Sequence, residues 1–192
     1  MELRDILARR RMHRAFTDEP VPRERIERIV STIRHAPSGG FSQGQSIVVV
    51  TDPELRAEIG RRFEDDCGWV AGAPLHLVIS ADEAQYHARY NEPDKLAVTG
   101  GVEVTWPVPY WFVDAGALMM LVLLAAIDER LASAFIGHPD QKRIFDELLG
   151  LPEDVVPIGL ALIGKPGDYP APSSRMRAAR RSLDDLVHWG GW

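Results

Sequence analysis

The sequence predicts a single-domain α+β fold, in which a few β-strands are interleaved with helices. Three observations predict it. Short apolar runs recur four times, helical apolar spacing fills most of the stretches between them, and neither a repeat nor a linker divides the 192 residues. The apolar share of 45% is ordinary for a globular protein and is enough for one core.

The first 80 residues predict three helices and two strands. Apolar residues at spacings of three and four indicate the helices, and two of these helices have a proline in their first turn. Asp52 precedes the second of these prolines and is expected to cap its helix. The expected helices span residues 2–11, 22–35 and 52–66, and the expected strands span residues 46–51 and 74–80.

Helices and strands are also expected to alternate in the second half of the chain. Residues 81–98 are polar and partly helical, whereas two glycines and two prolines exclude a long helix from residues 99–111. The 16 residues from Phe112 to Ile127 are the most apolar stretch, contain Asp114, and are shorter than the roughly 20 residues of a membrane span. They predict a buried helix over residues 112–130. A strand over 132–136, a helix from Gly137 to Gly150 and a buried strand over 155–163 follow.

Charge is unevenly distributed along a chain whose net charge is −6. Residues 1–35 carry +3 and residues 165–181 carry +4, whereas the residues between them carry −11. This pattern argues against nucleic-acid binding, which needs a broad basic face. It is compatible with a few arginines that meet at one small anion, and equally with separate solvated faces.

Motifs of metal, nucleotide and hydrolytic sites are missing. The six histidines show no metal-ligand spacing, and the chain has neither HExxH, CxxC nor Gly-x-Gly-x-x-Gly. Ser38 lacks the GxSxG context of a nucleophile. The single cysteine, Cys67, excludes an internal disulfide and, with no apolar signal segment, favours the cytoplasm. An enzyme of this composition is expected to rely on a cofactor.

Two polar segments are candidates for ligand binding. The stretch HAPSGGFSQGQSIVVV, residues 35–50, joins a charged helix to a strand through a loop whose glycines allow close backbone approach. In RRMHRAF, Arg10 and Arg14 lie four residues apart and would share a face if the helix continued. Two such arginines can bind a phosphate.

These segments, with three others, resemble the nitroreductase family of FMN-dependent oxidoreductases. The similar stretches, in the order of the family motifs, are RRMHRAF, APSGGFSQGQSIVVVTD, VDAGALMMLVLLAAIDERLASAFIG, LLGLPEDVVPIGLALIGKPGD and RRSLDDLVHW. Together they cover nearly the whole chain. The resemblance implies a central antiparallel sheet flanked by helices in an intertwined homodimer. Residues 1–192 would form one domain, with residues 165–192 as a tail that embraces the partner.

The resemblance also implies two FMN sites at the dimer interface. Arg10, Arg14 and Arg180 would hold the FMN phosphate, which would bring the two basic ends of the chain to one dianion. The turn at Ile136 and Gly137 would direct a backbone N–H at the flavin N5. With this arrangement the protein needs no catalytic acid or base, because the flavin carries the chemistry.

The loop after residue 35 would supply the other half of the site, from the partner subunit. By the resemblance, Pro37, Ser38 and Gly39 would lie against the isoalloxazine ring, and Gln43 would lie near it.

The chain departs from the family motifs at three places. Met12 replaces a serine that donates to the phosphate, Phe41 replaces an asparagine, and Gly44 replaces a proline. Phe41 after Gly40 is nearer to the flavin-fragmenting subgroup.

Aromatic residues in TWPVPYWF are candidates for contact with substrate. Trp106, Tyr110 and Trp111 can form a lid over the flavin, or they can pack against the central helix or the dimer seam. Phe41 is a further candidate for the substrate side.

The implied reaction is the reduction of a small nitro, quinone or enone compound by NADH or NADPH, through ping-pong exchange on FMN. No metal, membrane or nucleic-acid partner is expected. Alternatives stay open. They are a flavin-fragmenting or dehalogenating relative, a flavin-binding protein without catalysis, and an enzyme that takes electrons from a deazaflavin.

Overall fold

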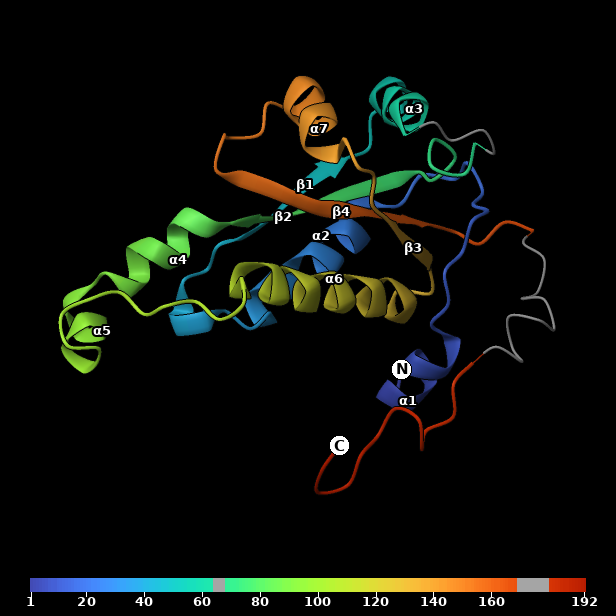
Figure 1. The fold of residues 1–192 in the computed structure, drawn as a ribbon. Coiled ribbons are helices and arrows are strands. Elements are labelled where there is room, and N and C mark those ends of the chain that lie inside the picture. Colours follow the sequence, from blue (N-terminus) through green and yellow to red (C-terminus); the bar gives the residue numbers. More distant parts are fainter. Residues whose placement is uncertain (64–67, 169–179) are drawn as a thin grey trace.

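The computed structural model describes residues 1–63, 68–168 and 180–192. Helices and strands alternate along the chain, as the sequence predicts (Figure 1). The strands are β1 (Gln45–Val50), β2 (Leu75–Asp82), β3 (Ala132–Ile136) and β4 (Val155–Gly164). The helices are α1 (Leu3–Arg9), α2 (Arg23–Val30), α3 (Pro53–Arg62), α4 (Glu83–Tyr90), α5 (Pro93–Val98), α6 (Tyr110–Asp128) and α7 (Gln141–Leu149), with 3₁₀ segments η1 (Ser31–His35) and η2 (Gly39–Phe41).

The strands form one antiparallel sheet in the order β1-β2-β4-β3. The inner strands β2 and β4 are buried along most of their length. Val78 in β2 pairs with Val48 on one side and with Leu160 on the other. The structure confirms the predicted central antiparallel sheet, and each strand begins and ends within two residues of its predicted bounds.

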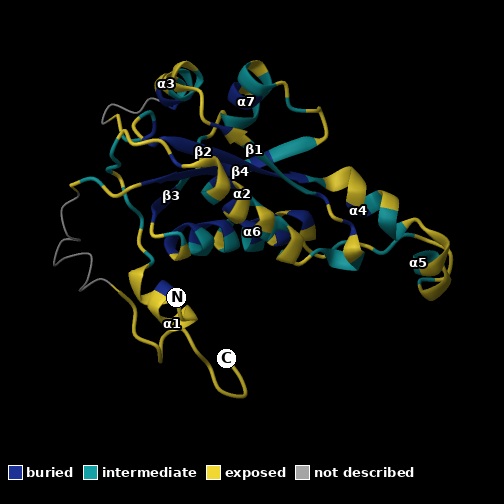
Figure 2. Ribbon diagram, turned by 180° about the vertical axis from the view of Figure 1, so that it is seen from behind, coloured by how far each residue is buried: buried dark blue, intermediate teal, exposed yellow. Residues whose placement is uncertain are grey.

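Helices cover both faces of the sheet, as Figures 1 and 2 show. Leu77 and Ile163 pack with α2 and α6 in one buried cluster, whereas Val78 and Leu162 pack with α3 and α7 in another. Successive side chains of a strand point to opposite faces, so one continuous apolar run serves both cores. Helices α4 and α5 extend to one side of these layers.

The first helix is shorter than predicted. Helix α1 ends at Arg9, and the backbone of Arg10 is already extended. Met12 then pairs with Ser133 of β3 in an isolated parallel bridge, and its partly buried side chain joins the cluster under α3 and α7. This pairing along the edge of the sheet replaces another turn of helix, so Arg10 and Arg14 do not share a helical face.

The other predicted helices differ from the observed ones mainly at their ends. The helix expected over residues 22–35 changes from α2 to the 3₁₀ segment η1 after Val30. The last residues expected in this helix, 64–66, lie outside the described residues. Helix α7 stops at Gly150, whose φ of 65° is left-handed, as expected for a C-terminal glycine.

Asp52 caps α3 as predicted, because its Oδ1 accepts the Leu55 N–H at 2.8 Å. We expect Asp52→Ala to lower the free energy of unfolding by about 1 kcal/mol, measured by urea denaturation. Glu153→Ala, at an exposed position after α7, is the control and should change stability by less than about 0.5 kcal/mol. Equal losses in both variants would contradict the capping role.

Helix α6 lies along the sheet and carries much of the core. It has 19 residues and contains an 18-residue stretch with a mean hydropathy of 2.0, so it meets the length and composition criteria of a membrane span. The helix is longer than the apolar stretch counted in the sequence, so length alone does not argue against a span. Leu118 and Val122 are nevertheless buried in the core cluster against β2 and β4. Its other side leaves Phe112, Val113 and Met120 exposed.

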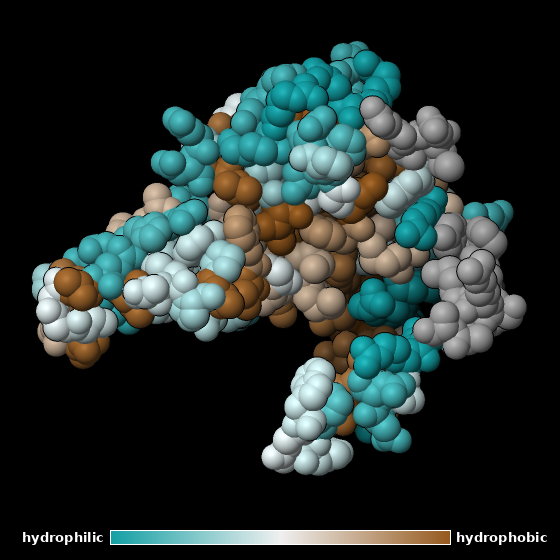
Figure 3. All heavy atoms as spheres, in the orientation of Figure 1, coloured by the Kyte–Doolittle hydropathy of each residue, from teal (hydrophilic) through white to brown (hydrophobic). Residues whose placement is uncertain are grey.

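The end of the chain runs away from the sheet. Phe16 pairs with Pro166 just after β4, and residues 180–192 lead past α1 to the C-terminus (Figure 1). Trp189 and Trp192 are 94% and 104% exposed. The space-filling view shows this end projecting from the body of the molecule (Figure 3). That the tail embraces a partner stays a prediction.

Candidate functional site

Residues 37–43, called here the 37–43 loop, have an unusual backbone. Gly40, Phe41 and Gln43 all adopt left-handed conformations, with φ of 61°, 63° and 55°. Such values are uncommon for residues other than glycine. A Cβ on Gly40 would also lie 2.6 Å from the ring of Tyr90, so this glycine is required by packing within the chain as well as by its φ.

The 37–43 loop is fixed by hydrogen bonds to α4 and α6. The Asp114 Oδ2 accepts the Gly39 N–H at 2.7 Å and the Tyr86 hydroxyl at 2.7 Å. The Arg89 Nε donates to the Gly40 carbonyl at 2.9 Å. Within the loop, the Gln43 N–H donates to the Ser38 Oγ at 2.6 Å. The Ser38 side chain is thus committed to the shape of the loop, in agreement with the absence of a nucleophile motif.

Asp114 and Tyr86 form a buried polar pair behind the 37–43 loop. Asp114 is 7% exposed and Tyr86 is completely buried. Burial, followed by the hydrogen bond to Asp114, raises the pKa of the Tyr86 hydroxyl. The tyrosine therefore stays protonated and donates to the carboxylate, and the pair holds structure rather than supplying a proton to a reaction.

Gly44, one of the departures from the family motif, has a packing reason. A Cβ at this position would lie 2.5 Å from the Asp82 carbonyl oxygen and 2.7 Å from the Tyr86 ring. The Asp82 N–H also donates to the Gly44 carbonyl at 2.7 Å. The backbone of the loop thus passes too close to β2 and α4 for a side chain.

The aromatic residues before and within α6 divide into two groups. Trp111 is buried with Tyr86 in a small core cluster, and its ring lies 5.8 Å from that of Trp106. Trp106 is partly buried and makes an edge contact with Tyr90 at 4.6 Å. Tyr110 is 41% exposed. Trp111 therefore packs in the core, whereas Trp106 and Tyr110 stay candidates for a lid.

Glu103 holds the segment that carries Trp106 against α4. It accepts hydrogen bonds from Trp106 Nε1 at 2.9 Å and Asn91 Nδ2 at 2.6 Å, and it contacts His87 Nδ1 at 2.5 Å. The other ring nitrogen of His87 lies 3.2 Å from Glu83 Oε1. The hydrogen bonds to Glu103 and then to Glu83 raise the pKa of His87 above its ordinary value of 6.5.

This arrangement predicts a pH-dependent contact. Because the pKa of His87 is raised in the folded state, its stabilisation is fully present below pH 6.5 and is lost as the pH rises through the folded pKa. We expect an NMR titration to place the His87 midpoint above 6.5, and Glu103→Gln to lower that midpoint. A midpoint at or below 6.5 in the unaltered protein would contradict the contact.

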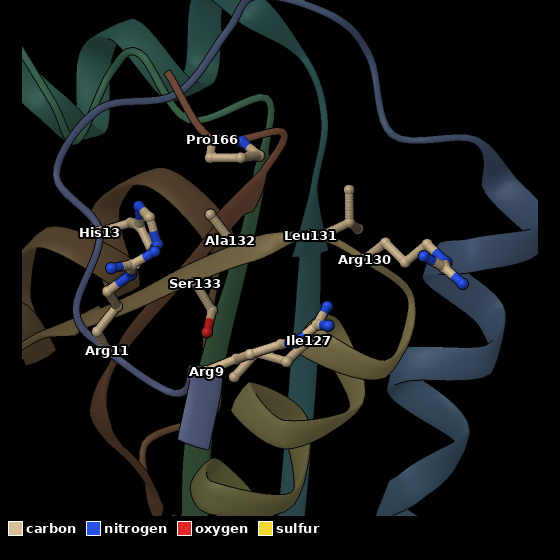
Figure 4. A pocket seen from close by; sticks show the side chains of 9 residues that line it. All are labelled: Arg9, Arg11, His13, Ile127, Arg130, Leu131, Ala132, Ser133 and Pro166. Carbon is tan, nitrogen blue, oxygen red and sulfur yellow. Dashed lines mark hydrogen bonds between the residues drawn. The ribbon is translucent and has the colours of Figure 1, made fainter. Parts of the chain in front are cut away.

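A cationic pocket lies where the N-terminal segment passes the start of β3 (Figure 4). Its volume is about 230 Å³, and none of its lining residues is acidic. The Arg11 Nε donates to the His13 Nε2 at 3.2 Å. Burial, and then the charge of Arg11, lower the pKa of His13, so the imidazole is neutral at neutral pH and accepts this bond. The lining residues are Arg9, Arg11, His13, Ile127, Arg130, Leu131, Ala132, Ser133 and Pro166.

The phosphate residues expected from the resemblance are not among those that line this pocket. The backbone leaves the helix in an extended conformation at Arg10, and Met12 pairs with β3; alternate side chains of an extended segment point to opposite sides. Arg14 lies with its guanidinium 5.6 Å from the centre of the Trp69 ring. Arg180 is exposed in the tail. The arginines that line the pocket are instead Arg9, Arg11 and Arg130, which sequence reasoning missed; in Figure 4 the Arg130 side chain points away from the other two.

The turn after β3 lies at the opposite end of this strand from the cationic pocket. Ile136 is the last residue of β3, and Gly137 after it is exposed. The turn is held by Gln141, whose Oε1 accepts the His138 N–H at 3.1 Å. The five residues of β3 span roughly 16 Å, so an elongated molecule can reach from the pocket to this turn.

The 37–43 loop and the cationic pocket lie at opposite ends of α6. Asp114 holds the loop near the start of the helix, whereas Ile127 lines the pocket near its end. Thirteen residues of helix separate these two by roughly 20 Å. One copy of the chain therefore does not bring the loop and the pocket together around one small molecule.

Comparison with known proteins identifies the family. The sequence model of the Nitroreductase family matches residues 7–92 and 106–165, which is most of the chain. The chain belongs to the nitroreductase family. The match of this nitroreductase to the family model is interrupted at residues 93–105, which contain α5 and the segment that leads to Trp106, and it does not include residues 1–6 or 166–192.

Individual relatives agree with this assignment. The chain is 30% identical to an FMN reductase [NAD(P)H] of Bacillus subtilis, over 85% of this chain and 65% of that protein, so it spans slightly less than two thirds of that relative. It is 34% identical to an NADPH-flavin oxidoreductase of Vibrio harveyi, over 90% of this chain and 69% of that protein. A solved nitroreductase in complex with FMN from Exiguobacterium sibiricum has a similar fold, with a TM-score of 0.79, 20% identity, and coverage of 98% and 97% of the two chains.

The sequence held only a weak signal for the pocket residues and for the role of Asp114. Arg11 and His13 lie two residues apart just after α1, which is the spacing of one side of an extended segment, whereas the prediction continued the helix to residue 11. Asp114 was visible as the acid within an apolar helix, but its hydrogen bond to Gly39 joins residues 75 positions apart. Neither contact follows from local sequence.

Proposed function

We propose that this nitroreductase binds FMN and uses NADH or NADPH to reduce small nitro, quinone or enone compounds. The observation that carries the proposal is the cationic pocket at the start of β3, with an exposed backbone turn at the end of the same strand. A phosphate monoester carries a charge of about −1.5 to −2 at neutral pH, which suits a pocket lined by three arginines and no acid. The relatives named for FMN and NAD(P)H support the same cofactor and donors.

The residues at the two ends of β3 suit the two ends of an FMN molecule. Arg9, Arg11 and Arg130 would hold the phosphate in this pocket. The resemblance instead assigns the phosphate to Arg10, Arg14 and Arg180, and alanine variants of Arg10, Arg11 and Arg14 separate these two sets. The backbone at Ile136 and Gly137 would meet the flavin ring. When bound, FMN accepts a hydride equivalent from reduced nicotinamide and passes two electrons to an acceptor. The described side chains around it orient ligands and need not transfer protons.

The protein is proposed to act as a homodimer. The 37–43 loop is about 20 Å along α6 from the pocket of its own chain, so Pro37, Ser38, Gly39 and Gln43 would meet the ring of the FMN held by the partner. The exposed Phe112, Val113 and Met120 on α6 and the exposed tryptophans of the tail supply apolar surface for a second copy. A cytoplasmic location stays a prediction from the cysteine content.

An absorbance spectrum of the purified protein tests the proposal. The protein is saturated with FMN, desalted, and then mixed with NADH or NADPH and menadione. We expect about one FMN per subunit and nicotinamide oxidation that depends on menadione. A colourless protein after desalting would show that it binds no FMN and would refute the proposal.

The same preparation separates the alternatives. A flavin-fragmenting relative would yield ring fragments from reduced flavin in air. A dehalogenating relative would release halide from a halogenated phenol when reductant is present. A flavin-binding protein without catalysis would retain FMN but oxidise nicotinamide no faster than free flavin does.

A further inference from the structure

Phe41 is an apolar ring held in solvent by a strained backbone. Its side chain is 76% exposed, and its φ of 63° lies in the left-handed region. Left-handed backbone is unfavourable for any residue other than glycine. A residue that is both strained and exposed gains nothing from its own fold, and such outliers concentrate at sites that bind ligands.

The position of Phe41 is fixed from both sides. Before it, the Gly39 N–H is bound by Asp114 and the Gly40 carbonyl by Arg89. After it, the Gln43 N–H is bound by the Ser38 Oγ at 2.6 Å. These bonds tie the 37–43 loop to two helices and to itself, so the ring of Phe41 is presented in one direction.

Asp114 is the central support of this arrangement. Its Oδ2 accepts from Gly39 and from Tyr86 within 2.7 Å, in a site from which water is largely excluded. A buried carboxylate with two donors holds its partners strongly, because each donor would otherwise be left without a bond. Asp114 therefore acts on the position of Phe41 through its hydrogen bond to Gly39.

The surroundings of Phe41 favour a small ligand over a protein surface. Its neighbours in the loop are glycine, serine and glutamine, so the ring is a single apolar side chain in a polar segment. A subunit interface has a continuous apolar centre, as on α6, whereas ligand sites combine an aromatic wall with a few polar groups. An aromatic ring in such a place stacks on a flat molecule.

We propose that Asp114, through Gly39, positions the 37–43 loop so that Phe41 forms a stacking wall for flat aromatic acceptors. This inference rests on the proposed function, because the loop would lie beside the FMN held by the partner. Phe41 then selects the acceptor, and Asp114 is a positioning residue. Planar quinones and nitroaromatics are the favoured class, and acceptors without a flat face gain nothing from this wall.

Steady-state kinetics of the FMN-loaded protein test the selection. The acceptors are menadione, which is flat, and ferricyanide, which has no face to stack. We expect Phe41→Ala to raise the ratio of the KM for menadione to that for ferricyanide about two- to tenfold, and Phe41→Tyr to restore it. Val98→Ala, on exposed α5, is the matched control for loss of an exposed apolar side chain.

Positioning by Asp114 is tested with a double-mutant cycle. Asp114→Asn should raise the same ratio, and adding Phe41→Ala to it should raise the ratio little further, because both changes remove one wall. Tyr86→Phe removes one of the two bonds to Asp114 and serves if Asp114→Asn does not fold. If the increases in the KM ratio of the two single variants multiplied in the double variant, the positioning role of Asp114 would be overturned.

Other outcomes are equally decisive. An unchanged KM ratio in Phe41→Ala, with FMN content intact, would overturn the stacking wall. A Phe41→Ala protein that becomes monomeric in light scattering would show that the ring packs on a second copy, and would also overturn it. Failure of the unaltered protein to bind FMN would instead refute the proposed function.

Discussion

Replacing Arg11 by alanine is expected to weaken FMN binding by about 1.5–3 kcal/mol, roughly 10- to 150-fold, the range of a hydrogen bond to a charged group. Arg11 lines the cationic pocket beside His13, and its loss removes one of the three arginine charges that line the pocket. Fluorescence titration of the apoprotein with FMN measures the change.

Comparison with neighbouring arginines shows which side of the N-terminal segment meets the phosphate. The resemblance predicts a similar loss for Arg10→Ala and Arg14→Ala, whereas Arg4→Ala on α1 is the control and should bind FMN normally. A loss in Arg10→Ala and Arg14→Ala with none in Arg11→Ala would place the phosphate outside the pocket of Figure 4. No loss in any of the three would exclude the whole segment from the FMN site.

Alanine at Gly44 is expected to lower the free energy of unfolding by about 1–3 kcal/mol, or more if the loop cannot shift. Its Cβ would lie 2.5 Å from the Asp82 carbonyl oxygen, which is backbone and gives way only if β2 moves. Urea denaturation of the FMN-free protein measures the loss, since bound FMN would add its own stabilisation.

The control for this variant is Gly191→Ala, where a Cβ would meet nothing within 4 Å. It should leave stability within about 0.5 kcal/mol of the unaltered protein. If Gly44→Ala were as stable as Gly191→Ala, the close approach of the loop to β2 and Tyr86 would be wrong, and the glycine would need another explanation.

Much of the fold could be predicted because its signals are local. The run of residues 155–163 is apolar throughout, and it forms the inner strand β4 where both faces are covered. Gly150 ends its helix through its own left-handed conformation, and Asp52 caps its helix through a bond three residues away. These features depend on neighbours in sequence and need no knowledge of the tertiary fold.

The site was harder to predict because its contacts are between distant residues. The end of α1 depends on the pairing of Met12 with Ser133, and that pairing decides which arginines face the pocket. The loop that carries the strained Phe41 is bound through Gly39 to Asp114, which is far away in sequence. The resemblance to the family pointed to the segments that contain the 37–43 loop and part of the pocket, but the geometry within them depends on contacts that local sequence does not encode.

The most direct test of a site shared by two subunits is the FMN content of a mixed dimer. One subunit carries Arg9→Glu and Arg11→Glu, which replace two positive charges of the pocket by negative ones. The other subunit carries Gly39→Trp, whose side chain would occupy the space where the flavin ring lies against the 37–43 loop. The two subunits are produced together with different affinity tags, and the dimer with both tags is purified. Each variant alone is expected to lose FMN.

If the pocket of one subunit and the 37–43 loop of the other form each site, the mixed dimer has one site with every defect and one with none. About half of the normal FMN per dimer should then return, together with menadione-dependent nicotinamide oxidation. If pocket and loop of one subunit formed each site, both sites would be defective. A mixed dimer without FMN would therefore contradict the shared site.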